Sequence, residues 1–148
     1  MPVFDYSFTV KAPLSKVAQF HHDTRALKLL TPFPIIVQIH RVEPLAEGSV
    51  SDFTLWFGPL PIHWVAVHKD VDKQRGFTDV QQKGPAKTWV HTHTFSPEGN
   101  DLTRITEHIE YEHYPGFRGI LSRLLFPKPG LKALFTYRKI VTGRHTAK

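Results

Sequence analysis

The sequence contains no cysteine. This absence excludes a disulfide framework, a thiol nucleophile and a cysteine-ligated zinc site, and it is typical of proteins from a reducing compartment. The chain also lacks any run of 18 apolar residues, which a membrane-spanning helix requires, and its first residues lack the basic and apolar regions of a signal peptide. We therefore expect a cytoplasmic protein without a membrane span.

Motifs for nucleotide binding and for covalent hydrolysis are missing as well. The sequence has no Gly-x-Ser-x-Gly, no P-loop and no Gly-x-Gly-x-x-Gly. It has 19 Lys and Arg against 13 Asp and Glu, which gives a net charge of +6 with neutral histidines. A basic balance can attract nucleic acid, a membrane surface or an acidic ligand. The charges are spread along the chain, however, which favours a solvated basic surface, and we expect no nucleic-acid partner.

Apolar side chains alternate at the start of the chain, where Phe4, Tyr6, Phe8 and Val10 point one way. This period of two predicts a strand with one buried face. Helices are expected next, over 14–22 and 23–30. The sequence then predicts six more strands, over 35–43, 48–57, 62–71, 75–83, 87–96 and 102–113, with turns at 58–61, 84–85 and 97–100. Their spacing predicts antiparallel neighbours.

The C-terminal quarter of the chain has a helical pattern, since Leu131, Leu134 and Phe135 share one helix face. Pro127 and Pro129 predict a break before a helix that runs from about 130 to 143. Neither a repeat nor a linker is visible, so residues 1–148 are predicted to form a single domain.

The order of these elements and two stretches of sequence resemble one superfamily. The opening FDYSFTVKAPLSKVAQFHHD and the stretch from Phe77 to Phe95, FTDVQQKGPAKTWVHTHTF, are similar to the START-like or SRPBCC superfamily, closest to its small bacterial polyketide cyclase/dehydrase-type ligand-binding proteins. The resemblance spans nearly the whole chain and implies an α+β helix-grip fold: a seven-stranded curved antiparallel sheet around a long C-terminal helix, with two short helices after the first strand. It implies no single activity, because the superfamily hosts transporters, cyclases and hydrolases.

A bent sheet closed by one helix leaves a cleft, and clefts of this kind are mostly apolar with a few polar groups. Alternation predicts which side chains line it. The large aromatics of strand 87–96 turn Trp89 inward, and Ile105 and Ile109 turn Glu107 inward on the next strand. We expect a cavity of several hundred cubic ångströms with a ligand-binding lining of Phe53, Phe57, Trp64, His68, Asp79, Gln81, Trp89, His91, His93, Phe95, Glu107, Tyr111, Leu131, Leu134 and Phe135.

The polar members of this set allow three interpretations. In the first, they satisfy one another and the backbone, as buried polar groups must. In the second, some of them orient the polar end of a ligand. In the third, they perform chemistry: His91, His93 or Glu107 moves a proton, or the histidines and Glu107 hold a metal. Because His-x-His pairs are common in proteins without metals, we expect neither a metal nor another cofactor.

The leading functional hypothesis is non-catalytic binding or transport of a small hydrophobic or aromatic molecule. The alternative is a cyclase/dehydrase-type enzyme that acts on a polyketide-like or aromatic substrate through a His/Glu proton-transfer pair. A third hypothesis, a module that docks on membranes or partners, comes from basic residues on the apolar C-terminal segment: Arg118, Arg123, Lys128, Lys132, Arg138 and Lys139. The sheet needs that apolar face for its own closure, which weighs against the third hypothesis.

Overall fold

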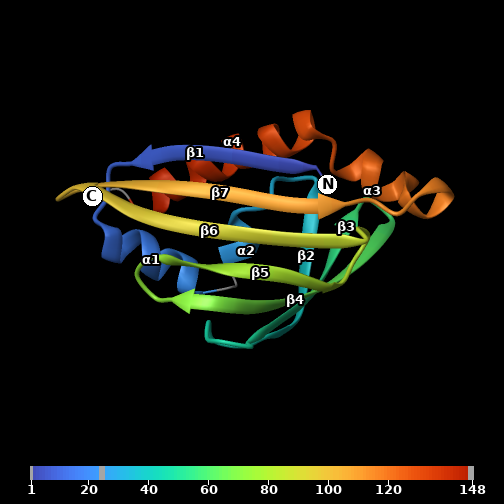
Figure 1. Cartoon of the computed structure of the whole chain (residues 1–148), viewed down its shortest axis with the longest axis horizontal. Coiled ribbons are helices and arrows are strands. Elements are labelled where there is room, and N and C mark those ends of the chain that lie inside the picture. The colour runs from blue at the N-terminus through green and yellow to red at the C-terminus, as the bar shows by residue number, and fades with distance from the viewer. Residues whose placement is uncertain (1, 24–25, 147–148) are drawn as a thin grey trace.

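Seven strands form one antiparallel sheet in the order β1-β7-β6-β5-β4-β3-β2. The computed structural model describes residues 2–23 and 26–146. In Figure 1 the sheet curves around α4, with α1 and α2 on the same side, so the expected helix-grip architecture is confirmed. The strands are β1 (Val3–Val10), β2 (Ile35–Val42), β3 (Val50–Phe57), β4 (Leu60–Asp72), β5 (Gly76–Lys83), β6 (Thr88–Gly99) and β7 (Leu102–Glu112). The helices are α1 (Leu14–His22), α2 (Ala26–Leu29), the 3₁₀ helix η1 (Gly116–Gly119), α3 (Ile120–Leu125) and α4 (Lys128–Thr146).

The inner face of the sheet is the one that alternation predicts. Trp89 and Phe95 of β6 are buried, whereas Val90 and Thr92 between them are only half-buried. The β6–β7 register places His93 opposite Glu107. The polar residues expected inside therefore lie on the concave face, toward the helices.

Two prolines lie inside strands and not in the turns predicted at 58–61 and 97–100. Pro61 belongs to β4 and Pro97 to β6. The neighbouring strand β5 reaches neither, because it pairs with β4 only from Val65 and with β6 only as far as Thr94. Each proline thus sits where its strand has one partner, and its missing N–H interrupts no central ladder.

The C-terminal break occurs at Pro127 alone, since Pro129 lies within α4. The first turn of a helix needs no donor from its backbone nitrogens, so proline is tolerated there. The helix continues to Thr146, beyond its predicted end at 143. Part of the second predicted helix, residues 24–25, lies outside the described residues. Within the described part of the chain, no helix is both long enough and apolar enough to cross a membrane.

The packed core is divided, and this division positions the site. Under α1, the sheet is filled by one cluster that includes Phe8, Val17, Phe77, Phe95 and Ile105. Each fully buried side chain of this size contributes about 1.5–3 kcal/mol to stability. Beside α3 and α4, the aromatic side chains of a second cluster surround a space that they do not fill.

Candidate functional site

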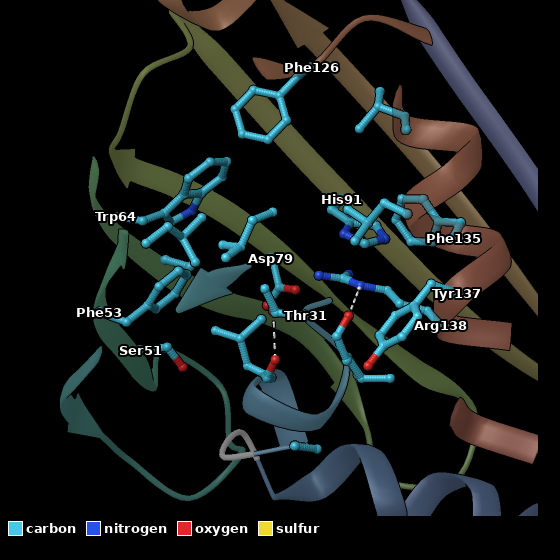
Figure 2. A pocket seen from close by; sticks show the side chains of 18 of the residues that line it. Thr31, Ser51, Phe53, Trp64, Asp79, His91, Phe126, Phe135, Tyr137 and Arg138 are labelled. Atoms are coloured by element: carbon cyan, nitrogen blue, oxygen red, sulfur yellow. Dashed lines mark hydrogen bonds between the residues drawn. The ribbon is translucent and has the colours of Figure 1, made fainter. Parts of the chain in front are cut away.

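A cavity of about 500 Å³ lies between the concave face of the sheet and the helices α2, α3 and α4 (Figure 2). Its size is within the range of about 300–1,000 Å³ typical of ligand sites and agrees with the sequence-based expectation. Aromatic rings form one end. Phe53 stacks on Trp64 at 6.3 Å between ring centroids, Trp64 meets Trp89 edge-on at 5.4 Å, and Phe126 lies 5.1 Å from Trp89.

Most of the predicted lining residues border this cavity: Phe53, Phe57, Trp64, His68, Asp79, Trp89, His91, His93, Leu131, Leu134 and Phe135. Four do not. The amide of Gln81 turns back to the backbone of Ala86, and Phe95 belongs to the core under α1. Glu107 lies behind the imidazoles at 4% exposure, and Tyr111 is buried behind an aromatic ring of the cavity wall.

The polar end of the cavity is a chain of alternating imidazoles and carboxylates. His68 Nε2 lies 2.9 Å from Asp79 Oδ1, and the other Asp79 oxygen accepts a hydrogen bond from His93 Nε2 at 2.8 Å. His93 Nδ1 donates to Glu107 Oε1 at 2.9 Å, and His91 Nε2 donates to Glu107 Oε2 at 3.0 Å. The predicted proximity of Glu107 to His91 and His93 is therefore confirmed.

His93 carries a positive charge in this arrangement. An ionised carboxylate only accepts hydrogen bonds, so a ring with a carboxylate oxygen at each nitrogen must have both nitrogens protonated. Burial alone would lower the pKa of His93, but Glu107 and Asp79 outweigh it and raise that pKa to about 10. Burial would likewise raise the pKa values of Asp79 and Glu107, yet their imidazole partners hold both well below the usual range.

His91 is the neutral counterpart of His93. Its ring lies 3.9 Å from that of His93, and burial together with the neighbouring cation lowers the pKa of His91. Because its Nε2–H is directed at Glu107, its Nδ1 is left as a hydrogen-bond acceptor. Nδ1 has no hydrogen-bond partner among the described residues, and His91 borders the cavity. The polar end thus offers an acceptor as well as a cation.

The close approach of β5 to β6 holds His93 in place. This close approach depends on the glycine at position 76. A Cβ at Gly76 would lie 1.9 Å from the carbonyl oxygen of His93, and the φ of +131° is one that other residues rarely adopt. Any other residue at Gly76 would therefore push the strands apart beside the ion pair between His93 and Asp79.

Several residues at the cavity were not predicted from the sequence. Arg138 of α4 points into the cavity on the side of Asp79, with its Nε donating to the Leu30 carbonyl at 3.2 Å (Figure 2). This position corrects the view of Arg138 as part of a basic surface. The sequence contains a pattern that indicates this position: Arg138 lies three residues after Phe135 and four after Leu134, and therefore on the same helix face.

Further polar residues that were not predicted border the cavity, from different elements: His21, Asp23, Thr31, Ser51 and Tyr137. His21 of α1 donates Nδ1–H to the Val17 carbonyl at 2.8 Å, and burial lowers the pKa of His21 to about 4. The hydroxyl of Ser51 is buried without a hydrogen-bond partner in the part of the chain that the structure describes. Alternation with Phe53 could have indicated Ser51, whereas no local pattern indicates His21.

One cluster among the described residues could hold a metal ion: Asp79, His91 and His93 offer ligand atoms within 4.8 Å of one another. A metal-bound imidazole must give up the proton on its ligating nitrogen. His93 uses both of its N–H groups on carboxylates, so a metal would compete with these hydrogen bonds. The absence of a metal cofactor stays a prediction.

The sequence matches no family model and shows no significant match to a curated protein. Solved structures do match its fold. A START superfamily protein from Mycobacterium smegmatis has a TM-score of 0.70 and 12% identity, over 97% of this chain and 96% of that one. An aromatase/cyclase from Streptomyces sp. R1128 has a TM-score of 0.69 and 15% identity, over 98% and 90%. Norcoclaurine synthase from Thalictrum flavum, in complex with dopamine and hydroxybenzaldehyde, has a TM-score of 0.66 and 19% identity, over 99% and 89%.

These matches define the class of fold. The chain has the START-like, or SRPBCC, helix-grip fold that the sequence resemblance implied. The identities are low, so the likeness extends to the fold and leaves the ligand to be argued from this chain's own cavity.

Proposed function

We propose that this domain binds one small hydrophobic or aromatic molecule in its cavity and carries it without chemical change. The observation that carries the proposal is the cavity itself, about 500 Å³ of space walled by the rings of Phe53, Trp64, Trp89 and Phe126. Protein interiors normally pack to crystal-like density. An unfilled space of this size with aromatic walls therefore favours a bound ligand that contacts these rings.

The polar end favours a ligand with a hydrogen-bonding group. Arg138 reaches into the cavity, and its terminal guanidinium nitrogens make no hydrogen bond to the described residues. The Ser51 hydroxyl and Nδ1 of His91 are also without partners there. A molecule with an apolar body and an acceptor at one end would satisfy the guanidinium, while its body contacts the aromatic walls.

Filling the cavity should weaken binding of a ligand. Leu134 of α4 borders the cavity, and we expect Leu134→Trp to lower the affinity for 8-anilinonaphthalene-1-sulfonate (ANS) at least about tenfold, or about 1.4 kcal/mol. Fluorescence titration of the wild type should give one ANS per chain. The matched control is Ile140→Trp, because Ile140 lies on the same helix, is 50% exposed and does not border the cavity. Equal affinities in the two variants, both with native circular dichroism, would contradict the proposal.

The role of Arg138 can be separated from that of the apolar walls with two related probes. ANS carries a sulfonate, and N-phenyl-1-naphthylamine is its neutral analogue. We expect Arg138→Met to lower the affinity for ANS about tenfold, since charge-assisted hydrogen bonds contribute about 1.5–3 kcal/mol. The affinity for the neutral probe should be nearly unchanged. Both affinities are measured by fluorescence titration.

Tyr137→Phe is the control for the contact between α4 and α2. It removes a second hydrogen bond from α4 to this region, from the Tyr137 hydroxyl to the Leu29 carbonyl at 3.4 Å. It removes no charge and keeps the ring that borders the cavity. If Arg138→Met lowers the affinity for both probes equally, Arg138 acts through the packing of α2. That result would exclude a role of Arg138 in ligand recognition.

A second candidate function, proton transfer on a bound aromatic or polyketide-like substrate, is favoured by His91. A neutral imidazole whose Nε2–H is held by a carboxylate and whose Nδ1 borders a cavity has the arrangement of a general base. In this candidate Glu107 orients His91, and Nδ1 accepts the proton. Nitrogen-15 NMR of wild-type protein at pH 7 would exclude it by showing a proton on Nδ1 of His91.

A further inference from the structure

Exposed apolar side chains gather on η1 and α3, at one end of the molecule. Phe117 is 92% exposed, Leu124 73% and Ile120 45%. They follow one another at spacings of three and four residues on consecutive helical turns, which places them on one side. Single exposed apolar residues are ordinary, but a contiguous group marks an interaction surface. We call Phe117, Ile120 and Leu124 the apolar tip.

The apolar tip is held firmly and stands away from the rest of the fold. The guanidinium of Arg123 donates to the carbonyls of Tyr114 at 2.7 Å and Gly116 at 3.2 Å, which ties α3 to the start of η1. The segment projects beyond the end of the sheet (Figure 1). Apolar side chains that project in this way can insert into a partner with a deformable surface.

The segment that carries the apolar tip is basic, and Glu112, the acidic residue that precedes it at the end of β7, is paired with Lys87 at 3.5 Å. From His113 to Lys148 the sequence contains eight Lys and Arg and no Asp or Glu. Arg118 and Arg123 lie within η1 and α3, Lys128 and Lys132 lie in the first turns of α4, and all four residues are exposed. The hairpins at the opposite end of the sheet carry charges of both signs, among them the ion pairs between Arg41 and Glu43 and between Arg104 and Glu98. The excess of positive charge therefore lies in the segment that carries the apolar tip.

The tip also adjoins the cavity. Leu124 immediately precedes Leu125, which borders the cavity. Phe33, exposed to 86%, lies between Pro32 and Ile35, which border it from the other side. Exposed apolar groups thus flank the site on both the α3 side and the β2 side.

We propose that the apolar tip docks this domain on the surface of an anionic lipid bilayer. Phe117, Ile120 and Leu124 enter the boundary between headgroups and acyl chains, and the surrounding Lys and Arg side chains contact lipid phosphates. A second copy of the chain fits the tip poorly, because its own tip would bring the same positive charge. The docking does not depend on which molecule the cavity holds.

Vesicle co-sedimentation tests the proposal on the full chain. Wild-type protein should bind vesicles of phosphatidylcholine with 30% phosphatidylglycerol and bind pure phosphatidylcholine far more weakly. Binding should fall in 0.5 M NaCl, because salt screens exposed charges. Phe117→Ser/Leu124→Ser should lower the partition coefficient at least about tenfold, and Lys128→Gln/Lys132→Gln should lower it by about fivefold for each charge removed.

Ile140→Ser is the matched control, since Ile140 is a half-exposed apolar residue of α4 outside the tip, and it should bind as the wild type does. All substituted side chains are exposed, and unchanged thermal unfolding would verify that the variants fold. Failure of the wild type to bind anionic vesicles would overturn the proposal, and so would wild-type binding by the tip variant. Sedimentation equilibrium showing a dimer that the tip variant dissociates would overturn it in favour of a dimer interface.

Discussion

Replacing Glu107 by glutamine should lower the free energy of unfolding by about 3–5 kcal/mol, a large effect for so small a change in shape. Glu107 is 4% exposed and accepts hydrogen bonds from both His91 and His93. Removing one partner of a buried ion pair leaves the other charge without compensation, and this accounts for the size of the expected loss.

Hydrogen-bond geometry adds to the loss of charge. Both carboxylate oxygens of Glu107 face an imidazole N–H. A glutamine side chain has one acceptor oxygen and one NH₂ group, so one of the two imidazole donors would face another donor. His91 can relieve this clash only by moving its proton to Nδ1, which would remove the acceptor at the cavity.

The measurement is urea unfolding at pH 6.5, with Glu110→Gln as the control. Glu110 lies on the same strand, is half-exposed, and makes only a 3.6 Å contact with His108. Exposed substitutions of this kind usually change stability by less than about 0.5 kcal/mol. A loss below about 1 kcal/mol for Glu107→Gln would show that the network is not held together by buried charge.

The sequence was a good guide to the sheet because alternation is a local property. The choice of the inner face on β6 and β7 followed from Trp89, Phe95 and Ile109, and it brought His91 and His93 next to Glu107 across one hairpin. Antiparallel neighbours around a short turn leave little freedom in register. The polar cluster was therefore predictable before any tertiary contact was known.

The extent of the cavity was less predictable, because a strand face is longer than the cavity it borders. Phe95 and Tyr111 share the inner face with the lining residues but pack into solid core beside it. Phe126 and His21 reach the cavity only because α3 and α1 fold over the sheet. Contacts of this kind depend on helix docking, which periodicity along the chain does not encode.

Arg138 and Ser51 were overlooked for another reason. Both occupy positions whose spacing matches the inward-facing residues of their own elements, yet both are polar, and Arg138 was grouped with the basic residues of the C-terminal segment. Polar residues at inward-facing positions are rare in a packed core. Their presence here coincides with a cavity, where a polar group has room for a partner.

The charge on His93 predicts an unusual dependence of stability on pH. The pKa of His93 is raised to about 10 in the folded protein, against about 6.5 in an unfolded chain. The stabilisation from its proton is complete below pH 6.5 and is lost as the pH rises toward 10. We expect the free energy of unfolding to fall above pH 6.5 by as much as about 1.4 kcal/mol per pH unit.

The other groups that face His93 act on the acid side of this window. The lowered pKa values of His91 and His21 mean that these rings stay neutral in the folded state, so stability is lost as the pH falls below 6.5. The lowered pKa values of Asp79 and Glu107 add a further loss as the pH falls through about 4.5. Maximum stability is therefore expected near pH 6.5, with His93 dominating the alkaline side.

Urea unfolding at half-unit steps from pH 5 to 9 measures this profile. Glu107→Gln should flatten the slope between pH 6.5 and 9, because it removes one of the two carboxylates that hold the proton on His93. His108→Gln should leave the slope nearly unchanged: the pKa of His108 is raised by its hydrogen bond to Asp5, but its side chain is 39% exposed and screened by solvent. A wild-type stability that is constant between pH 6.5 and 9 would mean that His93 is neutral, and Asp79 and Glu107 would then have to share a proton between them.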